Sequence, residues 1–102
     1  MNTIAALLGC GNNDAEVIEC INEDILEEAM QTLRDEGLAL SFESVYEACA
    51  KVGLRQAGIP ERSVEFDNNY ACAAIYVPDD VQARIYKRKL EHLEQMGFRV
   101  YY

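Results

Sequence analysis

Residues 63–77 read SVEFDNNYACAAIYV, and the spacing of apolar side chains changes here from a helical repeat to a repeat of two. Residues 64–67 alternate apolar and acidic side chains, which is typical of a strand with one buried face. Asn68 and Asn69 can adopt the positive φ values of a tight hairpin turn. Residues 70–77 are apolar on both faces, so we expect a return strand that is covered on both sides.

The sequence after this hairpin predicts a helix and a third strand. Asp79 and Gln82 have the spacing of a capping box, and the pattern continues as a helix over 79–96 until Gly97 stops it. Residues 98–102, FRVYY, alternate as a terminal strand. The second half therefore reads ββαβ, and a right-handed crossover would set the last strand parallel to the second.

The first half is helical. Asn13 can cap a long helix over 14–36 that ends at Gly37, and its apolar positions follow the i, i+3, i+4 rule. Ser41 can cap a second helix that ends near Gly58. The short connection between the two helices favours an antiparallel pair.

These elements predict an α+β fold with two N-terminal helices, plus a short first turn at 3–9, packed on a three-stranded ββαβ sheet. No repeat or linker divides the chain, so we expect one domain over 1–102. It combines an acidic helical half, 1–58, with the ββαβ half, 59–102. The two N-terminal helices would cover one face of the sheet and the third helix the other.

The charge of the chain is strongly uneven. Residues 1–50 hold eleven carboxylates and one base, Arg34, whereas residues 51–102 hold seven acids and eight bases. The formal net charge of −9 therefore belongs to the first half. Such a field would repel nucleic acid and anionic lipid, so we expect no direct nucleic-acid or membrane binding and a basic protein surface as partner.

The acids of the first long helix form rows of like charge. Glu19 and Glu23, Glu23 and Glu27, and Asp24 and Glu28 are i, i+4 pairs, each of which costs about 0.2–0.5 kcal/mol in an isolated helix. A solvated face is one interpretation, but such a face usually mixes both signs of charge. The alternative is a surface that captures a basic partner. Its predicted partner-binding residues are Glu16, Glu19, Glu23, Asp24, Glu27 and Glu28.

The second half offers a route to self-association. Arg84 and Arg88 belong to a basic cluster in the third helix, which could meet the acidic helix of a second copy. The end strand, which includes Val100 and Tyr102, contains no proline and could pair edge to edge. These four residues are the predicted oligomer interface, and a homodimer acting as a structural or adaptor protein is the alternative function.

Catalytic and metal-binding signatures are missing from the sequence. His92 is the single histidine, and the intervals between Cys10, Cys20, Cys49 and Cys72 fit no zinc site. We expect free thiols, no metal, no cofactor and no catalytic residue. A small enzyme remains the third alternative, after an interaction protein and a structural oligomer.

Size and charge suggest a function class. The apolar residues after Met1 are too few for a membrane span and lack the basic flank of a signal peptide, so we expect a cytoplasmic protein. In general character, the chain resembles phage-encoded anti-CRISPR and anti-restriction proteins and the acidic immunity proteins that neutralise nuclease toxins. No motif carries this resemblance. It implies an inhibitor that occupies a basic nucleic-acid-binding surface.

Overall fold

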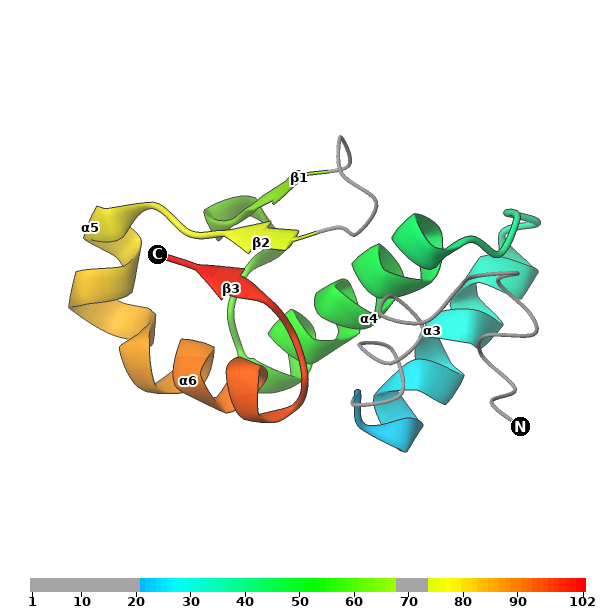
Figure 1. The fold of residues 1–102 in the computed structure, drawn as a ribbon, viewed down its shortest axis with the longest axis horizontal. Coiled ribbons are helices and arrows are strands. Elements are labelled where there is room, and N and C mark those ends of the chain that lie inside the picture. The colour runs from blue at the N-terminus through cyan, green and yellow to red at the C-terminus, as the bar shows by residue number, and fades with distance from the viewer. Residues whose placement is uncertain (1–20, 68–73) are drawn as a thin grey trace.

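The computed structural model describes residues 21–67 and 74–102 and confirms an α+β fold, with helices and a three-stranded sheet (Figure 1). The predicted first turn at 3–9 and the hairpin turn at 68–69 lie outside the described residues. In chain order, the elements are α3 (Glu23–Asp35), α4 (Phe42–Ala57), the 3₁₀ turn η1 (Glu61–Ser63), β1 (Glu65–Asp67), β2 (Ala74–Tyr76), α5 (Asp79–Val81), the π-helical segment η2 (Gln82–Tyr86), α6 (Lys87–Gln95) and β3 (Val100–Tyr101).

The helix α3 begins at Glu23, so the predicted helix over 14–36 does not continue through residues 21 and 22, and its part at 14–20 lies outside the described residues. Asn22 is extended, with φ −51° and ψ 131°, and its side-chain oxygen accepts a hydrogen bond of 2.9 Å from the backbone N–H of Asp24. Asparagine favours this N-cap position because it satisfies a backbone donor that the first turn leaves unpaired. The predicted stop is confirmed, since Gly37 follows the helix with φ 71°.

The helix α4 has the caps that its sequence predicts. Ser41 and Ser44 form a reciprocal capping box, in which each side-chain oxygen accepts a hydrogen bond from the other residue's backbone N–H. Gly58 ends the helix in the left-handed conformation, with φ 76°. Its buried face includes Val45, Tyr46, Cys49 and other residues of the central core.

The sheet has the order β1-β2-β3. The strands β1 and β2 are antiparallel and β2 and β3 are parallel, as the sequence predicts. Phe66, Ile75 and Val100 lie opposite one another and face the core. On the other face Tyr76 stacks on Tyr101 with ring centroids 5.1 Å apart, and Tyr101 is 47% exposed.

Among the described helices, α4 and α6 lie on the same side of the sheet, so the prediction that they cover opposite faces was wrong. The helices α4 and α6 contact each other and lie together beneath the sheet in Figure 1. Their buried side chains, such as Leu54 and Leu90, belong to the same core as Ile75. The other face of the sheet carries Tyr76 and Tyr101, and Ala74 of β2 is buried on that face.

The arrangement of the N-terminal helices also differs from the predicted layer. The helix α3 packs mainly against α4, on the side of α4 away from α6 (Figure 1). Its buried residues include Ile25, Ala29 and Leu33. The helix is therefore an outer layer that is supported by α4, with its polar face directed to solvent.

The predicted helix over 79–96 contains an interruption. The first turn, α5, passes into the π-helical segment η2 before α6 continues, and α6 ends before Gly97 as predicted. Asp79 does not act as the predicted cap, because Pro78 occupies the N-cap position without a side-chain hydrogen bond. In η2, Ile85 is 68% exposed.

Replacement of Gly53 by alanine is expected to destabilise the fold despite the better helix propensity of alanine. A Cβ atom at this position of α4 would lie 2.7 Å from Cε2 of Phe98 and 3.1 Å from Cδ2 of Leu93. Overpacking costs about 1–3 kcal/mol, whereas the gain in propensity is about 1 kcal/mol. We expect a net loss of about 1 kcal/mol in the free energy of unfolding, measured by urea denaturation.

A double-mutant cycle separates the two effects. In a Phe98→Leu background the ring that obstructs the new methyl group is gone, so Gly53→Ala should be neutral or stabilising there. A Gly53→Ala protein that is more stable than wild type would contradict the close contact between α4 and Phe98.

Candidate functional site

The described acids of the predicted partner-binding set lie on one outward side of α3. This acidic face consists of Glu23, Asp24, Glu27 and Glu28, all of which are exposed. Glu16 and Glu19 lie outside the described residues. The acidic face is opposite the buried residues Ile25, Ala29 and Leu33, as the helical periodicity predicts.

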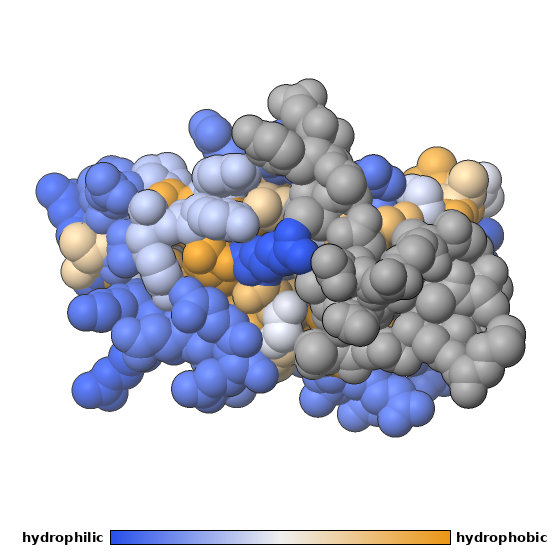
Figure 2. Space-filling model, viewed as in Figure 1, coloured by the Kyte–Doolittle hydropathy of each residue, from blue (hydrophilic) through white to orange (hydrophobic). Residues whose placement is uncertain are grey.

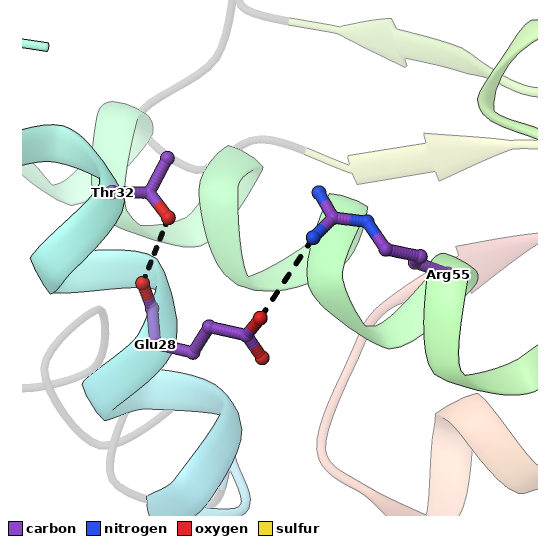
Figure 3. Close-up of polar contacts among 3 residues, drawn as sticks. All are labelled: Glu28, Thr32 and Arg55. Carbon is purple, nitrogen blue, oxygen red and sulfur yellow. Dashed lines mark hydrogen bonds and ion pairs between the residues drawn. The ribbon is translucent and has the colours of Figure 1, made fainter.

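Positive charge near the acidic face is sparse. Arg34 is the one base in the sequence of α3, and it lies in the last turn. Glu28 Oε1 lies 3.8 Å from Nη1 of Arg55, which reaches across from α4 (Figure 3). Both side chains are at least half exposed, so this ion pair contributes at most about 1 kcal/mol. Glu23, Asp24 and Glu27 form no ion pair with any residue of the described part of the chain.

A shallow hollow of about 490 Å³ extends the acidic face along α3. Gln31 Nε2 donates a hydrogen bond of 2.9 Å to Oδ1 of Asp35, and the hydroxyl of Thr32 donates to the backbone carbonyl of Glu28 (Figure 3). The hollow is lined by Asp24, Glu27, Glu28, Gln31, Thr32 and Asp35. These carboxylate and amide oxygens suit an arginine or lysine side chain of a partner.

Sequence reasoning missed the second half of this hollow. Gln31, Thr32 and Asp35 continue the acidic face by one and two turns, at positions i+4 and i+7 from Glu27 and Glu28. The helical spacing was the signal that could have included them. Because Gln31 and Thr32 are uncharged, they do not appear in a search for rows of acids.

A second groove, of about 340 Å³, separates the C-terminal half of α3 from α4. Its charges are mixed: Lys51 and Arg55 line it together with Glu36, Glu47 and Glu61, and Lys51 Nζ lies 3.3 Å from Oε1 of Glu47. This balance of charge gives the groove no strong preference for a basic partner. The acidic face is therefore the better candidate site.

The predicted oligomer residues lie at the other end of the molecule from α3 (Figure 1). Arg84 in η2 and Arg88 in α6 are exposed, and Val100 in β3 is half-buried. Figure 2 shows hydrophilic side chains gathered over α6 and along the lower edge near α3. One copy of the chain thus does not bring the basic and acidic surfaces together.

Tyr102 packs its half-exposed phenol near two acids of α6. Partial burial raises the pKa of Tyr102 to about 12, and Glu94, which accepts its hydrogen bond, and the charge of Glu91 act in the same direction. The neutral phenol is therefore the form that the fold favours. Its contribution to stability is present below the ordinary tyrosine pKa of about 10 and is lost as the pH rises towards 12.

Cys49 and His92, which were considered for enzyme chemistry, lie on different helices and in different surroundings. Cys49 is fully buried in α4, whereas His92 is exposed on α6. Burial raises the pKa of the Cys49 thiol to about 12. No group of three or more metal-ligating side chains gathers within residues 21–67 and 74–102.

Alkylation is expected to leave Cys49 unmodified in the native protein. At pH 8 a thiol with a pKa of about 12 is ionised to roughly one part in 10⁴, and only the thiolate reacts. Iodoacetamide labelling read by peptide mass spectrometry should therefore modify Cys49 at least about 100-fold more slowly in buffer than in urea. Equal rates in the two solvents would show that this part of α4 opens readily.

No protein-family model, curated protein or solved structure matches this chain. Among the described helices, none combines the length and the apolar character needed to cross a bilayer. The function is therefore inferred from the acidic face and its surroundings.

Proposed function

We propose that this chain is a small acidic inhibitor that binds the basic nucleic-acid-binding surface of a nuclease or nucleic-acid-processing complex in the cytoplasm. Inhibitors of this class include anti-CRISPR, anti-restriction and immunity or antitoxin proteins. The observation that carries the proposal is the four exposed carboxylates of the acidic face of α3, of which only Glu28 has an ion pair within the described residues. Such a face attracts a cationic surface and repels nucleic acid itself.

The spacing of the acids supports mimicry of a phosphate backbone. Glu23 and Glu27 form one row and Asp24 and Glu28 a second, and residues four apart on a helix are separated by about 6 Å along its axis. Two such rows side by side approach the density of a nucleic acid strand, which has one phosphate per about 3.4 Å. A groove that binds such a strand would accept the acidic face.

The support beneath α3 favours tight binding. Ile25, Ala29 and Leu33 are buried, and they anchor the helix on α4 while the carboxylates remain in solvent. The backbone of the acidic face is therefore ordered before a partner arrives, which reduces the entropy lost on association. The charge also accelerates encounter, so association should be fast and sensitive to salt.

Capture from host lysate tests the proposal. Immobilised wild-type protein is compared with Glu23→Lys/Glu27→Lys and with the control Glu61→Lys/Glu65→Lys, which changes the net charge equally at exposed acids outside α3. Bound proteins are eluted in a salt gradient and identified by mass spectrometry. We expect wild type and control, but not the α3 variant, to retain a nucleic-acid-binding protein whose binding or cleavage of nucleic acid is blocked.

Retention of the same proteins by all three baits would contradict the role of the acidic face. Retention of a partner that handles no nucleic acid would contradict the proposed class of target while leaving a binding role for the face.

A further inference from the structure

The π-helical segment presents an apolar side chain to solvent inside a basic cluster. Ile85 is 68% exposed, the highest value among the described large apolar residues, and both Arg84 and Arg88 beside it are exposed. The neighbouring Tyr86 is only partly exposed, and Nζ of Lys89 lies 5.8 Å from the centre of its ring. Single π-helical turns within α-helices occur frequently at functional sites.

The helix α3 carries a complementary hollow of about 400 Å³. Leu26 and Met30 form its apolar part, and Glu23 and Glu27 add negative charge, with Arg34 at one end. Met30 is 7% exposed and Leu26 is half-buried, so the hollow offers apolar surface beside two solvated carboxylates.

We propose that the occupant of this hollow is the η2 segment of a second copy of the chain, with Ile85 against Leu26 and Met30. Arg84 and Arg88 then face Glu23 and Glu27 of the other copy. Glu23 and Glu27 are four residues apart on the α-helix α3, about 6 Å along its axis, and Arg84 and Arg88 are four residues apart across the junction of η2 and α6. The two pairs are opposite in sign.

The shape of the molecule allows this contact to form twice. The chain measures 41 × 27 × 24 Å, and η2 and α3 lie at opposite ends of its long axis (Figure 1). Two copies packed side by side with opposite directions bring each η2 segment to the partner's α3. The result is a closed twofold dimer, in which the same two surfaces meet at both ends.

Dimer formation would make part of the acidic face inaccessible to the target, an inference that rests on the proposed function. The contact covers Glu23 and Glu27, which are also half of the surface offered to the target. Self-association and target binding therefore exclude each other. A cationic target has to displace the second copy, and dilution or salt favours the monomer.

Sedimentation velocity over a concentration series tests the dimer. Wild-type protein is expected to shift from 11.5 kDa to twice this mass as its concentration rises, and added salt should weaken the association. Ile85→Asp and Arg84→Glu/Arg88→Glu are expected to weaken it at least tenfold, because the first puts a charge against the apolar Leu26 and Met30 and the second places acids opposite Glu23 and Glu27. Arg62→Glu, an exposed change on η1, should leave it unaffected.

A charge swap provides the decisive comparison. Arg84→Glu/Arg88→Glu and Glu23→Arg/Glu27→Arg should each be monomeric alone, and their mixture should form a heterodimer through two attractive contacts, one with the native charges and one with the charges exchanged. The variants change only exposed residues, so circular dichroism should show the wild-type fold in each. Wild type that stays monomeric at all concentrations, a dimer that Ile85→Asp leaves intact, or a mixture without a heterodimer would overturn the proposal.

Discussion

Glu23→Lys/Glu27→Lys is expected to weaken binding to the inhibited target by at least about 100-fold, which corresponds to about 2.7 kcal/mol. The variant replaces two attractive charges with two that repel a basic surface, and like charges brought together across an interface cost several kcal/mol. The affinity of the remaining complex should also depend less on salt. Both quantities are measured by titration calorimetry or biolayer interferometry at several ionic strengths.

The loss of affinity should occur in a folded protein. Glu23 and Glu27 are exposed, so their replacement leaves the core unchanged. Lysine in the first turn of α3 loses a favourable interaction with the helix dipole, at a cost of about 0.3–1 kcal/mol for each position near the end. The control Glu61→Lys/Glu65→Lys has the same net charge and should bind almost as tightly as wild type. Equal losses in both variants would show that net charge alone, and not the acidic face, determines affinity.

Tyr46→Ala is expected to cause the largest loss of stability, about 3–5 kcal/mol. Tyr46 in α4 is fully buried, and its ring centroid lies 5.8 Å from that of Phe42 and 6.0 Å from that of Phe98. Its hydroxyl oxygen also accepts a hydrogen bond from the backbone N–H of Arg99, the residue before β3. The side chain thus joins α4 to the segment that leads into the last strand. Urea denaturation gives the change in the free energy of unfolding.

Tyr46→Phe isolates the hydrogen bond, because it keeps the ring and its contacts. It removes this acceptor from the N–H of the half-buried Arg99, and a typical hydrogen bond contributes about 0.5–1.5 kcal/mol. We therefore expect a loss clearly smaller than that of Tyr46→Ala. If Tyr46→Phe were as stable as wild type, the hydrogen bond to Arg99 would not contribute to the attachment of β3.

Local signals in the sequence were sufficient for several elements of the fold. Ser41 and Gly58 mark the ends of α4. The Ser41 side chain accepts a hydrogen bond from a backbone N–H of the first turn, and Gly58 adopts the left-handed conformation that ends the helix. The parallel placement of β3 beside β2 follows from the helical crossover that connects them. Such features depend on a few neighbouring residues or on the connection between two strands, and they could be predicted.

Other elements depended on a choice between alternative local structures, and the sequence pattern does not show which alternative forms. Helical periodicity continues through Asn22, yet its side chain caps a new helix at that point. The apolar residues of β2 indicated a helix on each face, but α4 and α6 share the core on one side, and Tyr76 stacks on Tyr101 on the other. The π-helical segment η2 has no sequence signal that distinguishes it from the α-helix around it.

The sequence was enough to predict which acids share one side of α3, but not the hollows and contacts around them. The spacing of Glu23, Asp24, Glu27 and Glu28 was enough to place them together on the solvent side of a helix. The hollow beside Leu26 and Met30 is lined by residues of α3. The reach of Arg55 to Glu28 depends on how α3 rests on α4, and this tertiary packing is not contained in the order of residues along one helix.

The most direct test of the central claim is competition between this protein and nucleic acid for the captured target. The affinity of wild-type protein for the target is measured in the presence of increasing amounts of a target-binding DNA or RNA. If the acidic face occupies the nucleic-acid groove, the apparent dissociation constant should rise in proportion to the nucleic acid, and no ternary complex should form. A stable ternary complex with unchanged affinity would show that the protein binds elsewhere and would contradict the account.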